Sequence, residues 1–247
     1  MENVSSQNRE NDEHTVESSK KMAVIELIVF IAFALISKEV MDAFLGPYSG
    51  QVSLITTVIL LTVYIRWRGQ KWSSMGLKSL PGRRAKLMVI PQAMMLFGAV
   101  LVIIISLTKG LDAIGLTFLS ETSESELARF GDISGNLRMY LTLIALSWIG
   151  AGFGEEMFFR GFLLTRLQTV FQGFRFAPIL AVVLGALLFG GVHFYAQGLA
   201  GFVNAGVIGL IFGTFFVRSK NNLWPLIVVH GFINSLGFTL DFLGLAG

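Results

Sequence analysis

Long apolar runs separated by short polar stretches make up most of the chain. A helix needs roughly 20 mostly apolar residues to cross the hydrocarbon core of a bilayer. Runs of about that length lie at 23–45, 50–66, 86–108, 137–157, 177–197, 199–217 and 223–243. The pattern predicts an all-α, polytopic transmembrane helix bundle of about seven spans, or eight if a re-entrant segment also crosses the membrane.

The first 22 residues do not follow this pattern. They are polar and contain no Phe, Tyr or Trp, so they lack the apolar surface that a packed structure needs. We therefore expect a disordered cytoplasmic tail over 1–22, followed by one membrane-embedded domain over 23–247.

The composition agrees with a membrane protein and narrows its chemistry. Hydrophobic residues make up 53% of the chain and charged residues 14%, against about 25% charged in soluble proteins. The absence of cysteine excludes a disulfide framework and thiolate catalysis. The net charge of +3 comes mostly from loops that suit an anionic leaflet. The lipid bilayer, and not nucleic acid, is the expected partner.

The basic residues predict the orientation of the spans. Most of the 19 Lys and Arg residues lie in the tail, in the loop 66–86 and just after the fourth and sixth runs. The loops on the opposite side hold Lys109 and Arg129. By the positive-inside rule the N-terminus is cytoplasmic and, with seven spans, the C-terminus lies outside.

The fourth run contains the charged segment GEEMFFRG, residues 154–161. Ionisable groups at bilayer depth are costly and usually face a cavity or a partner. Arg160 follows Glu156 by four residues, the spacing at which two side chains meet on one helix face. Glu155 points elsewhere and has no counter-ion nearby in sequence, so it needs a proton, a metal or another helix. The alternative is a purely structural ion cluster.

Other polar residues at depth lie on two further runs. His193 ends FGGVH in the fifth run, four residues after Phe189, and His230 precedes Asn234 by four in the seventh. A single intramembrane histidine is often only a helix-to-helix hydrogen bond. Together with Glu155, however, these residues supply a base, an imidazole and hydrogen-bond donors, which acyl chemistry on a carbonyl needs.

These residues also carry a family resemblance. The pattern EExxxR, FxxxH, HxxxN resembles that of the CPBP family, the CAAX proteases and bacteriocin-processing enzymes also called Abi proteins, which includes the type II CAAX prenyl endopeptidase. Here the pattern reads Glu155-Glu156-x-x-x-Arg160, Phe189-x-x-x-His193 and His230-x-x-x-Asn234. The resemblance covers about 137–240, and WSSMGL at 72–77 resembles a common loop of the family.

The resemblance implies an intramembrane glutamate-type endopeptidase without a cofactor. Glu155 is then the general base that holds water together with His193, and Asn234 with His230 forms the oxyanion hole. Glu156, Arg160 and Phe189 are then supporting residues. The expected substrate is a membrane-associated protein or peptide precursor, and the expected location is the bacterial cytoplasmic membrane, with peptide maturation such as bacteriocin processing as the role.

Two alternatives stay open at this point. Glu155, His193 and His230 form a two-histidine, one-glutamate set that could hold zinc with an open water position. The chain could also be a non-catalytic immunity or regulatory partner, in which the polar cluster only fixes helix packing.

Helix geometry adds a condition to the catalytic interpretation. His193 lies 16 residues, or about 24 Å, from the inner start of the fifth run, whereas Glu155 lies near the inner end of the fourth. The two can meet only if the fourth helix continues past Arg160, to about Arg166, and the fifth starts later or tilts. Small residues at steps of four from Gly201 to Gly213 predict close helix packing, and Glu26 is expected at the membrane interface.

Overall fold

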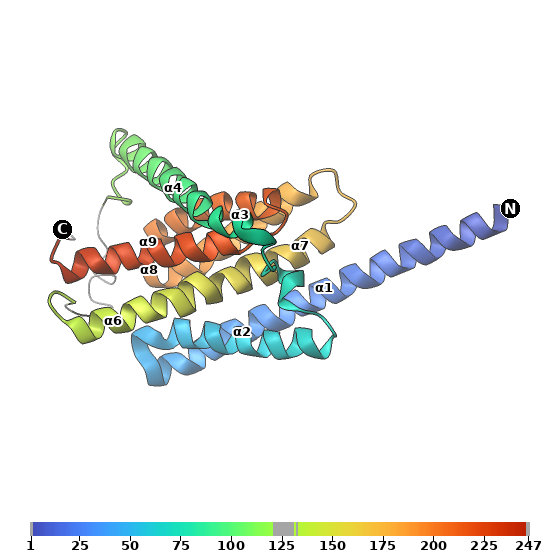
Figure 1. Ribbon diagram of the computed structural model, residues 1–247, viewed down its shortest axis with the longest axis horizontal. Helices are drawn as coiled ribbons and strands as arrows, with labels where there is room; N and C mark the ends of the chain where they lie inside the picture. Colours follow the sequence, from blue (N-terminus) through green and yellow to red (C-terminus); the bar gives the residue numbers. More distant parts are fainter. Residues whose placement is uncertain (1, 121–130, 132, 246–247) are drawn as a thin grey trace.

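The structure is a computed structural model that describes residues 2–120, 131 and 133–245, with side chains described from Thr15 onward. The described residues form helices and connecting turns, and contain no strand. The helices are α1 (Glu2–Leu45), α2 (Ser49–Trp67), α3 (Gly82–Leu87), α4 (Val89–Asp112), α6 (Leu137–Leu146), η3 (Ser147–Leu164), α7 (Thr165–Val170), α8 (Ala177–Arg218) and α9 (Trp224–Phe242), with short 3₁₀ turns η1 (Gly46–Tyr48) and η2 (Trp72–Met75). Figure 1 shows these helices as one elongated bundle.

Four helical stretches of the described chain are long and apolar enough to cross a membrane: Gly82–Asp112, Leu137–Val170, Ala177–Arg218 and Trp224–Phe242. The all-α, membrane-embedded architecture is thus confirmed. The runs at 23–45 and 50–66 lie in α1 and α2 but are not among those four stretches. The span count of seven or eight stays a prediction.

The fifth and sixth apolar runs both lie in α8, whose helical backbone is interrupted at Gly198. This residue has φ 62° and ψ −151°, a backbone conformation that is essentially restricted to glycine. The interruption falls at the boundary between 177–197 and 199–217 that the sequence predicts. The first and second halves of α8 therefore turn back on each other.

The first residues of the chain differ from expectation. The helix α1 begins at Glu2 and continues into the apolar run, where the sequence predicts a disordered tail over 1–22. Residues 2–45 contain neither glycine nor proline, and extending an existing helix is far easier than nucleating one. Figure 1 shows the beginning of α1 projecting beyond the bundle. Its cytoplasmic location stays a prediction.

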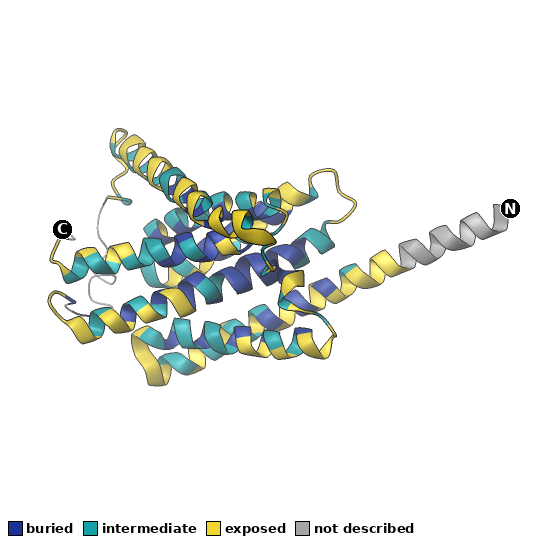
Figure 2. Ribbon diagram, viewed as in Figure 1, coloured by how far each residue is buried: buried dark blue, intermediate teal, exposed yellow. Residues whose placement is uncertain are grey.

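The central element is the continuous helix formed by α6, η3 and α7 from Leu137 to Val170. It passes Arg166, as the first part of the geometric condition required, whereas α8 begins at Ala177, no later than the predicted fifth run. The middle segment η3 has π-helical hydrogen bonding, and Figure 2 shows that it is the most buried part of the bundle. Most of its side chains from Glu156 onward are buried, so the catalytic candidates on it lie in the interior.

Glycines let neighbouring backbones approach this central helix. A Cβ at Gly152 would lie 3.1 Å from the carbonyl oxygen of Ile227 on α9. A Cβ at Gly161 would lie 2.8 Å from the carbonyl oxygen of Met75 in the WSSMGL loop. The small residues of α8 act in the same way within the chain, since a Cβ at Gly209 would lie 2.9 Å from Cα of Ala186. This ladder holds the two halves of α8 together.

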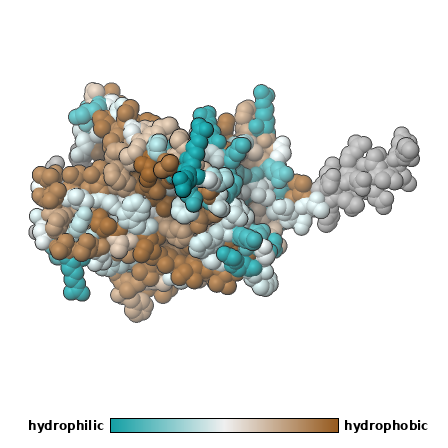
Figure 3. All heavy atoms as spheres, viewed as in Figure 1, coloured by the Kyte–Doolittle hydropathy of each residue, from teal (hydrophilic) through white to brown (hydrophobic). Residues whose placement is uncertain are grey.

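The predicted inner loops lie together at one end of the bundle. Leu223 N–H donates to the Gly76 carbonyl (3.1 Å), Lys78 Nζ to the Lys220 carbonyl (2.7 Å) and Trp224 Nε1 to the Lys78 carbonyl (2.8 Å). Figure 3 shows hydrophilic residues gathered toward the end from which α1 projects, with apolar surface over most of the rest. The shared side of these loops agrees with the basic-residue pattern, and the membrane face they occupy stays a prediction.

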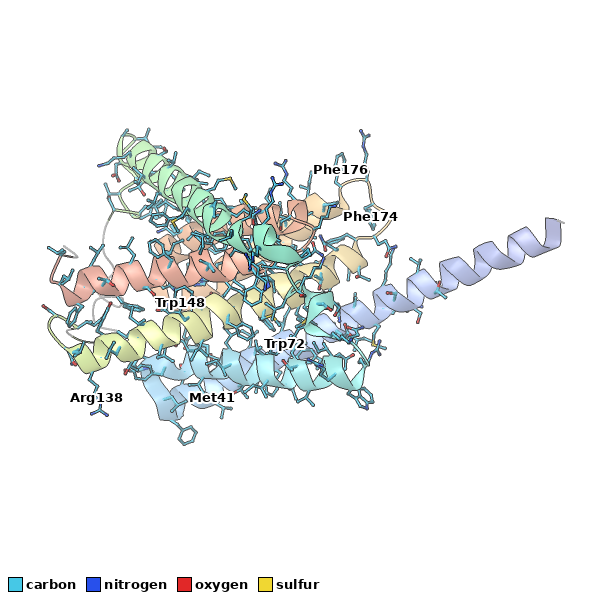
Figure 4. The ribbon with its side chains drawn as sticks, in the orientation of Figure 1. Met41, Trp72, Arg138, Trp148, Phe174 and Phe176 are labelled. Atoms are coloured by element: carbon cyan, nitrogen blue, oxygen red, sulfur yellow. The ribbon has the colours of Figure 1, made fainter. Side chains whose placement is uncertain are left out.

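Figure 4 marks the two ends of the bundle with labelled side chains. Phe174 and Phe176, in the connection after α7, lie toward the end from which α1 projects, whereas Met41 and Arg138 lie toward the opposite end. Trp148, at the start of η3, lies between α6 and α9. A Cβ at Gly231 would lie 2.7 Å from its indole ring. The residue after His230 is thus in direct contact with the central helix.

Candidate active site

Three helices supply the candidate residues. The helix η3 carries Glu155, Glu156 and Arg160, the first half of α8 carries Phe189 and His193, and α9 carries His230 and Asn234. The structure brings His230 directly to the two glutamates. It places Phe189 between Arg160 and the histidines.

Glu156 and Arg160 form the ion pair that the i,i+4 spacing predicts. Arg160 Nη1 donates to Glu156 Oε1 at 2.9 Å, and the side chains are 3% and 0% exposed, respectively. Removing either partner of such a pair destabilises the protein, because it leaves an uncompensated buried charge. The guanidinium also lies over the Phe189 ring, 4.3 Å from its centroid, and 5.3 Å from that of Phe212.

His230 connects the two glutamates across helices. Its Nδ1 lies 2.7 Å from Glu156 Oε1, and its Nε2 lies 3.8 Å from Glu155 Oε2. A carboxylate can only accept, so Nδ1 carries the proton of the shorter contact. The longer distance exceeds a hydrogen bond but places the imidazole beside Glu155. The partner that the local sequence lacks thus comes from α9.

Glu155 is the less constrained of the two carboxylates. Its side chain is 20% exposed, whereas that of Glu156 is fully buried. Glu155 Oε2 is buried and has no hydrogen-bond partner among the described residues. A buried polar atom without a partner calls for an explanation such as a catalytic role or a bound water. This carboxylate is therefore free to act on a ligand.

His193 lies one helical turn beyond Phe189 on α8. Its Nδ1 is 2.8 Å from the Phe189 carbonyl oxygen, and the two rings are 4.6 Å apart. When Nδ1–H donates to that carbonyl, the neutral imidazole keeps an unprotonated Nε2 that can accept a hydrogen bond. The i,i+4 spacing of FxxxH thus sets the tautomer.

Neither His193 nor Asn234 makes a hydrogen bond to Glu155 within the described chain. Asn234 lies one turn beyond His230 on α9 and is partly buried. His193 is likewise partly buried. The structure thus places both residues on the site helices, one turn from the contacts that Phe189 and His230 make, and leaves their predicted roles untested.

Sequence reasoning missed Phe212, which closes the cluster from the second half of α8. Its ring is fully buried and lies 6.0 Å from that of His230. Phe189 lies on another side of the same imidazole, at 6.2 Å. A phenylalanine in an apolar run gives no signal in the sequence that distinguishes it from other core residues.

A second buried polar cluster also escaped the sequence analysis. Glu26 is 5% exposed, so neighbouring helices cover it; its predicted level at the membrane interface stays a prediction. It accepts a hydrogen bond from Tyr64 Oη at 2.7 Å and forms an ion pair with Arg166. Arg166 Nη2 further contacts Gln70 Oε1 at 3.4 Å. This cluster joins α1 and α2 to α7, at the C-terminal end of the helix that carries the glutamates.

The zinc alternative has no ready-made ligand set in the described part of the chain. No group of three or more His, Asp or Glu side chains there is placed to hold a metal ion. In the predicted set, His230 Nδ1 is occupied by Glu156, which leaves Nε2 and Glu155 as two ligands. His193 would have to move to complete the set.

Comparison with known proteins assigns the region that contains all three motifs. Residues 137–236 match the family described as Type II CAAX prenyl endopeptidase Rce1-like. Comparisons with curated proteins and with solved structures gave no match. The matched segment begins at α6 and includes the central helix, both halves of α8 and His230 with Asn234 on α9. This match, over 100 of the 247 residues, supports membership of the segment in the CPBP/CAAX protease family.

Proposed function

We propose that the protein is an intramembrane endopeptidase in which Glu155 activates a water molecule. One observation carries the proposal: of two adjacent glutamates, Glu156 is fully buried and engaged through Oε1 by Arg160 and His230 Nδ1. Its Oε2 is unpaired in the described chain, as is Oε2 of Glu155, but Glu155 is partly exposed and its contact with His230, at 3.8 Å, is longer than a hydrogen bond. A structural ion cluster would need only the carboxylate of Glu156. The carboxylate of Glu155 is available as a general base.

In the proposed reaction, Glu155 takes a proton from water while the oxygen attacks the carbonyl carbon of the scissile peptide bond. The unprotonated Nε2 of His193 accepts a hydrogen bond from the other O–H of that water and so orients the water molecule. The tetrahedral intermediate collapses when the protonated Glu155 gives its proton to the leaving amine. Each step uses groups of the chain itself.

His230 and Asn234 are proposed to stabilise the negative oxygen of the intermediate. Geometry supports this role for His230: Glu156 Oε1 holds its Nδ1 at 2.7 Å, and its Nε2 lies 3.8 Å from Glu155 Oε2. In the proposed role, Nε2–H donates to the negative oxygen. Asn234, one turn further along α9, supplies an amide donor.

The proposed substrate is a membrane-associated peptide or protein precursor, and the proposed location is the bacterial cytoplasmic membrane. A CAAX-type substrate follows from the family's description, and bacteriocin or other peptide maturation follows from family resemblance. Neither is carried by a particular residue of the site. No resident cofactor is needed for the proposed steps.

The test compares newly formed peptide termini, by mass spectrometry, in cells that contain the wild type or Glu155→Gln at equal membrane levels. Cleavage products found only with the wild type are expected, and their sequences identify the substrate. Identical termini, with any phenotype kept by the nearly isosteric variant, would contradict the proposal and favour a non-catalytic immunity or regulatory partner.

A further inference from the structure

Asn204 is a polar side chain in the membrane interior that the proposed chemistry does not use. It lies in the second half of α8, among small and apolar residues. Its Oδ1 is buried and makes no hydrogen bond within the described chain. An amide oxygen left unpaired in an apolar setting is unfavourable, so such an atom needs a ligand or a function.

The position of Asn204 follows from the helix spacing. Asn204, Ile208 and Phe212 succeed one another at steps of four and so lie along one side of the helix. Phe212 is the residue whose ring contacts His230 and Arg160. The stripe that begins at the catalytic cluster therefore continues toward Asn204.

The second half of α8 and α9 are consecutive helices joined by a short connection, so they run in opposite directions. Phe212 and His230 lie at the same level, as their ring contact shows. From that level, Asn234 is about 6 Å along α9 and Asn204 is about 12 Å back along α8. Asn204 and Asn234 thus both lie beyond this contact, on the same side of the catalytic cluster.

The packing of the two halves of α8 places Asn204 beside the FxxxH motif. A Cβ at Gly190 would lie 2.6 Å from the Phe202 carbonyl oxygen and 3.3 Å from Gly206 Cα. These two residues flank Asn204. Asn204 is therefore level with Gly190, between Phe189 and His193 of the FxxxH motif.

From these positions we infer that Asn204 binds the backbone of the substrate peptide. An extended peptide rises about 3.3 Å per residue, so the roughly 12 Å of helix between Phe212 and Asn204 corresponds to about four residues of substrate. Oδ1 accepts the N–H of one residue within that distance of the scissile carbonyl. Asn204 is thus a substrate-positioning residue, and the inference rests on the proposed endopeptidase function.

The test uses purified protein and a synthetic peptide that spans the cleavage site identified by the comparison of termini. Asn204→Leu is expected to raise KM about 3- to 10-fold, the effect of losing one neutral hydrogen bond, and to leave kcat within about twofold. Gln51→Leu is the matched control, because Gln51 Oε1 is also buried and unpaired in the described chain but lies on α2 beside Gly150. KM is expected to stay unchanged in this variant.

A backbone ester makes the test specific for the hydrogen bond. Replacing each peptide bond within about four residues of the cleavage site in turn by an ester removes one N–H at a time, and one of these esters should raise KM for the wild type as much as Asn204→Leu does. In Asn204→Leu that ester should add nothing. Unchanged KM in Asn204→Leu, or fully additive effects, would overturn this inference alone. Absence of cleavage by the wild type would overturn the proposed function as well.

Discussion

The buried ion pair of Glu156 and Arg160 allows a prediction with a defined magnitude. The pair is 2.9 Å long and almost wholly excluded from solvent. Removing one partner of a buried pair typically destabilises a protein by about 3–5 kcal/mol, while replacing both by apolar residues is often neutral. We therefore expect Glu156→Leu and Arg160→Met each to lower the free energy of unfolding by about that amount, and the double variant to lose much less than the sum.

The exposed pair of Lys21 and Glu17 is a matched control for this cycle. It has the same i,i+4 spacing and a length of 2.7 Å, but the side chains are 72% and 65% exposed. Exposed pairs at this spacing contribute about 0.3–0.5 kcal/mol. The assay is unfolding in mixed micelles of all single and double variants. Additive losses at Glu156 and Arg160, or a coupling as small as that of the control pair, would refute the reasoning.

Three further predictions concern the surroundings of the site. Gly152→Ala should separate α9 from η3 by a few tenths of an ångström, because its Cβ would lie 3.1 Å from a backbone oxygen, and should lower peptidase activity several-fold. Gly98→Ala, whose Cβ meets nothing within 4 Å, is the control and should keep wild-type activity. Equal activities of the Gly152→Ala and Gly98→Ala variants would contradict this prediction. Tyr64→Phe should lower the unfolding free energy by about 1.5–3 kcal/mol, since its hydroxyl bonds a buried carboxylate, and an unchanged midpoint would show that the bond contributes nothing. Metal analysis of the purified wild type should find no stoichiometric zinc, and zinc that is lost in His193→Ala would instead support the metal alternative.

Local spacing accounts for the parts of the site that the sequence could predict. Glu156 and Arg160 share a helix, as do Phe189 and His193, so steps of four place them in contact whatever the rest of the fold does. The break at Gly198 was similarly visible, because the apolar pattern changes there. These features depend on few neighbours.

Features that depend on packing between distant segments were not visible. Glu26 and Arg166 are 140 residues apart, and their pairing follows from how α1 lies against α7. The same holds for the contact of Phe212 with His230 and for the WSSMGL loop, whose Met75 backbone fits against Gly161. Hydropathy indicated that Glu26 could reach the interface but contained no information about which helix covers it.

The helical start of α1 and the π-helical segment η3 show a different limit. A polar stretch reads as disordered by composition, although here it continues an apolar helix without a glycine or proline to stop it. Over the few turns of η3, the spacing of apolar residues in a π-helix cannot be distinguished from that in an α-helix. The π-helical segment coincides with four glycines at 150, 152, 154 and 161, which weaken the preference for a regular α-helix.

The central claim is that Glu155, and not its neighbour, is the catalytic base. The most direct measurement determines both peptide cleavage and thermal unfolding for Glu155→Gln and Glu156→Gln in the same micelles. The account predicts that Glu155→Gln lowers kcat by about 10²–10⁴-fold with the unfolding temperature unchanged, while Glu156→Gln lowers the unfolding temperature. Full activity of Glu155→Gln, with wild-type stability, would contradict the claim.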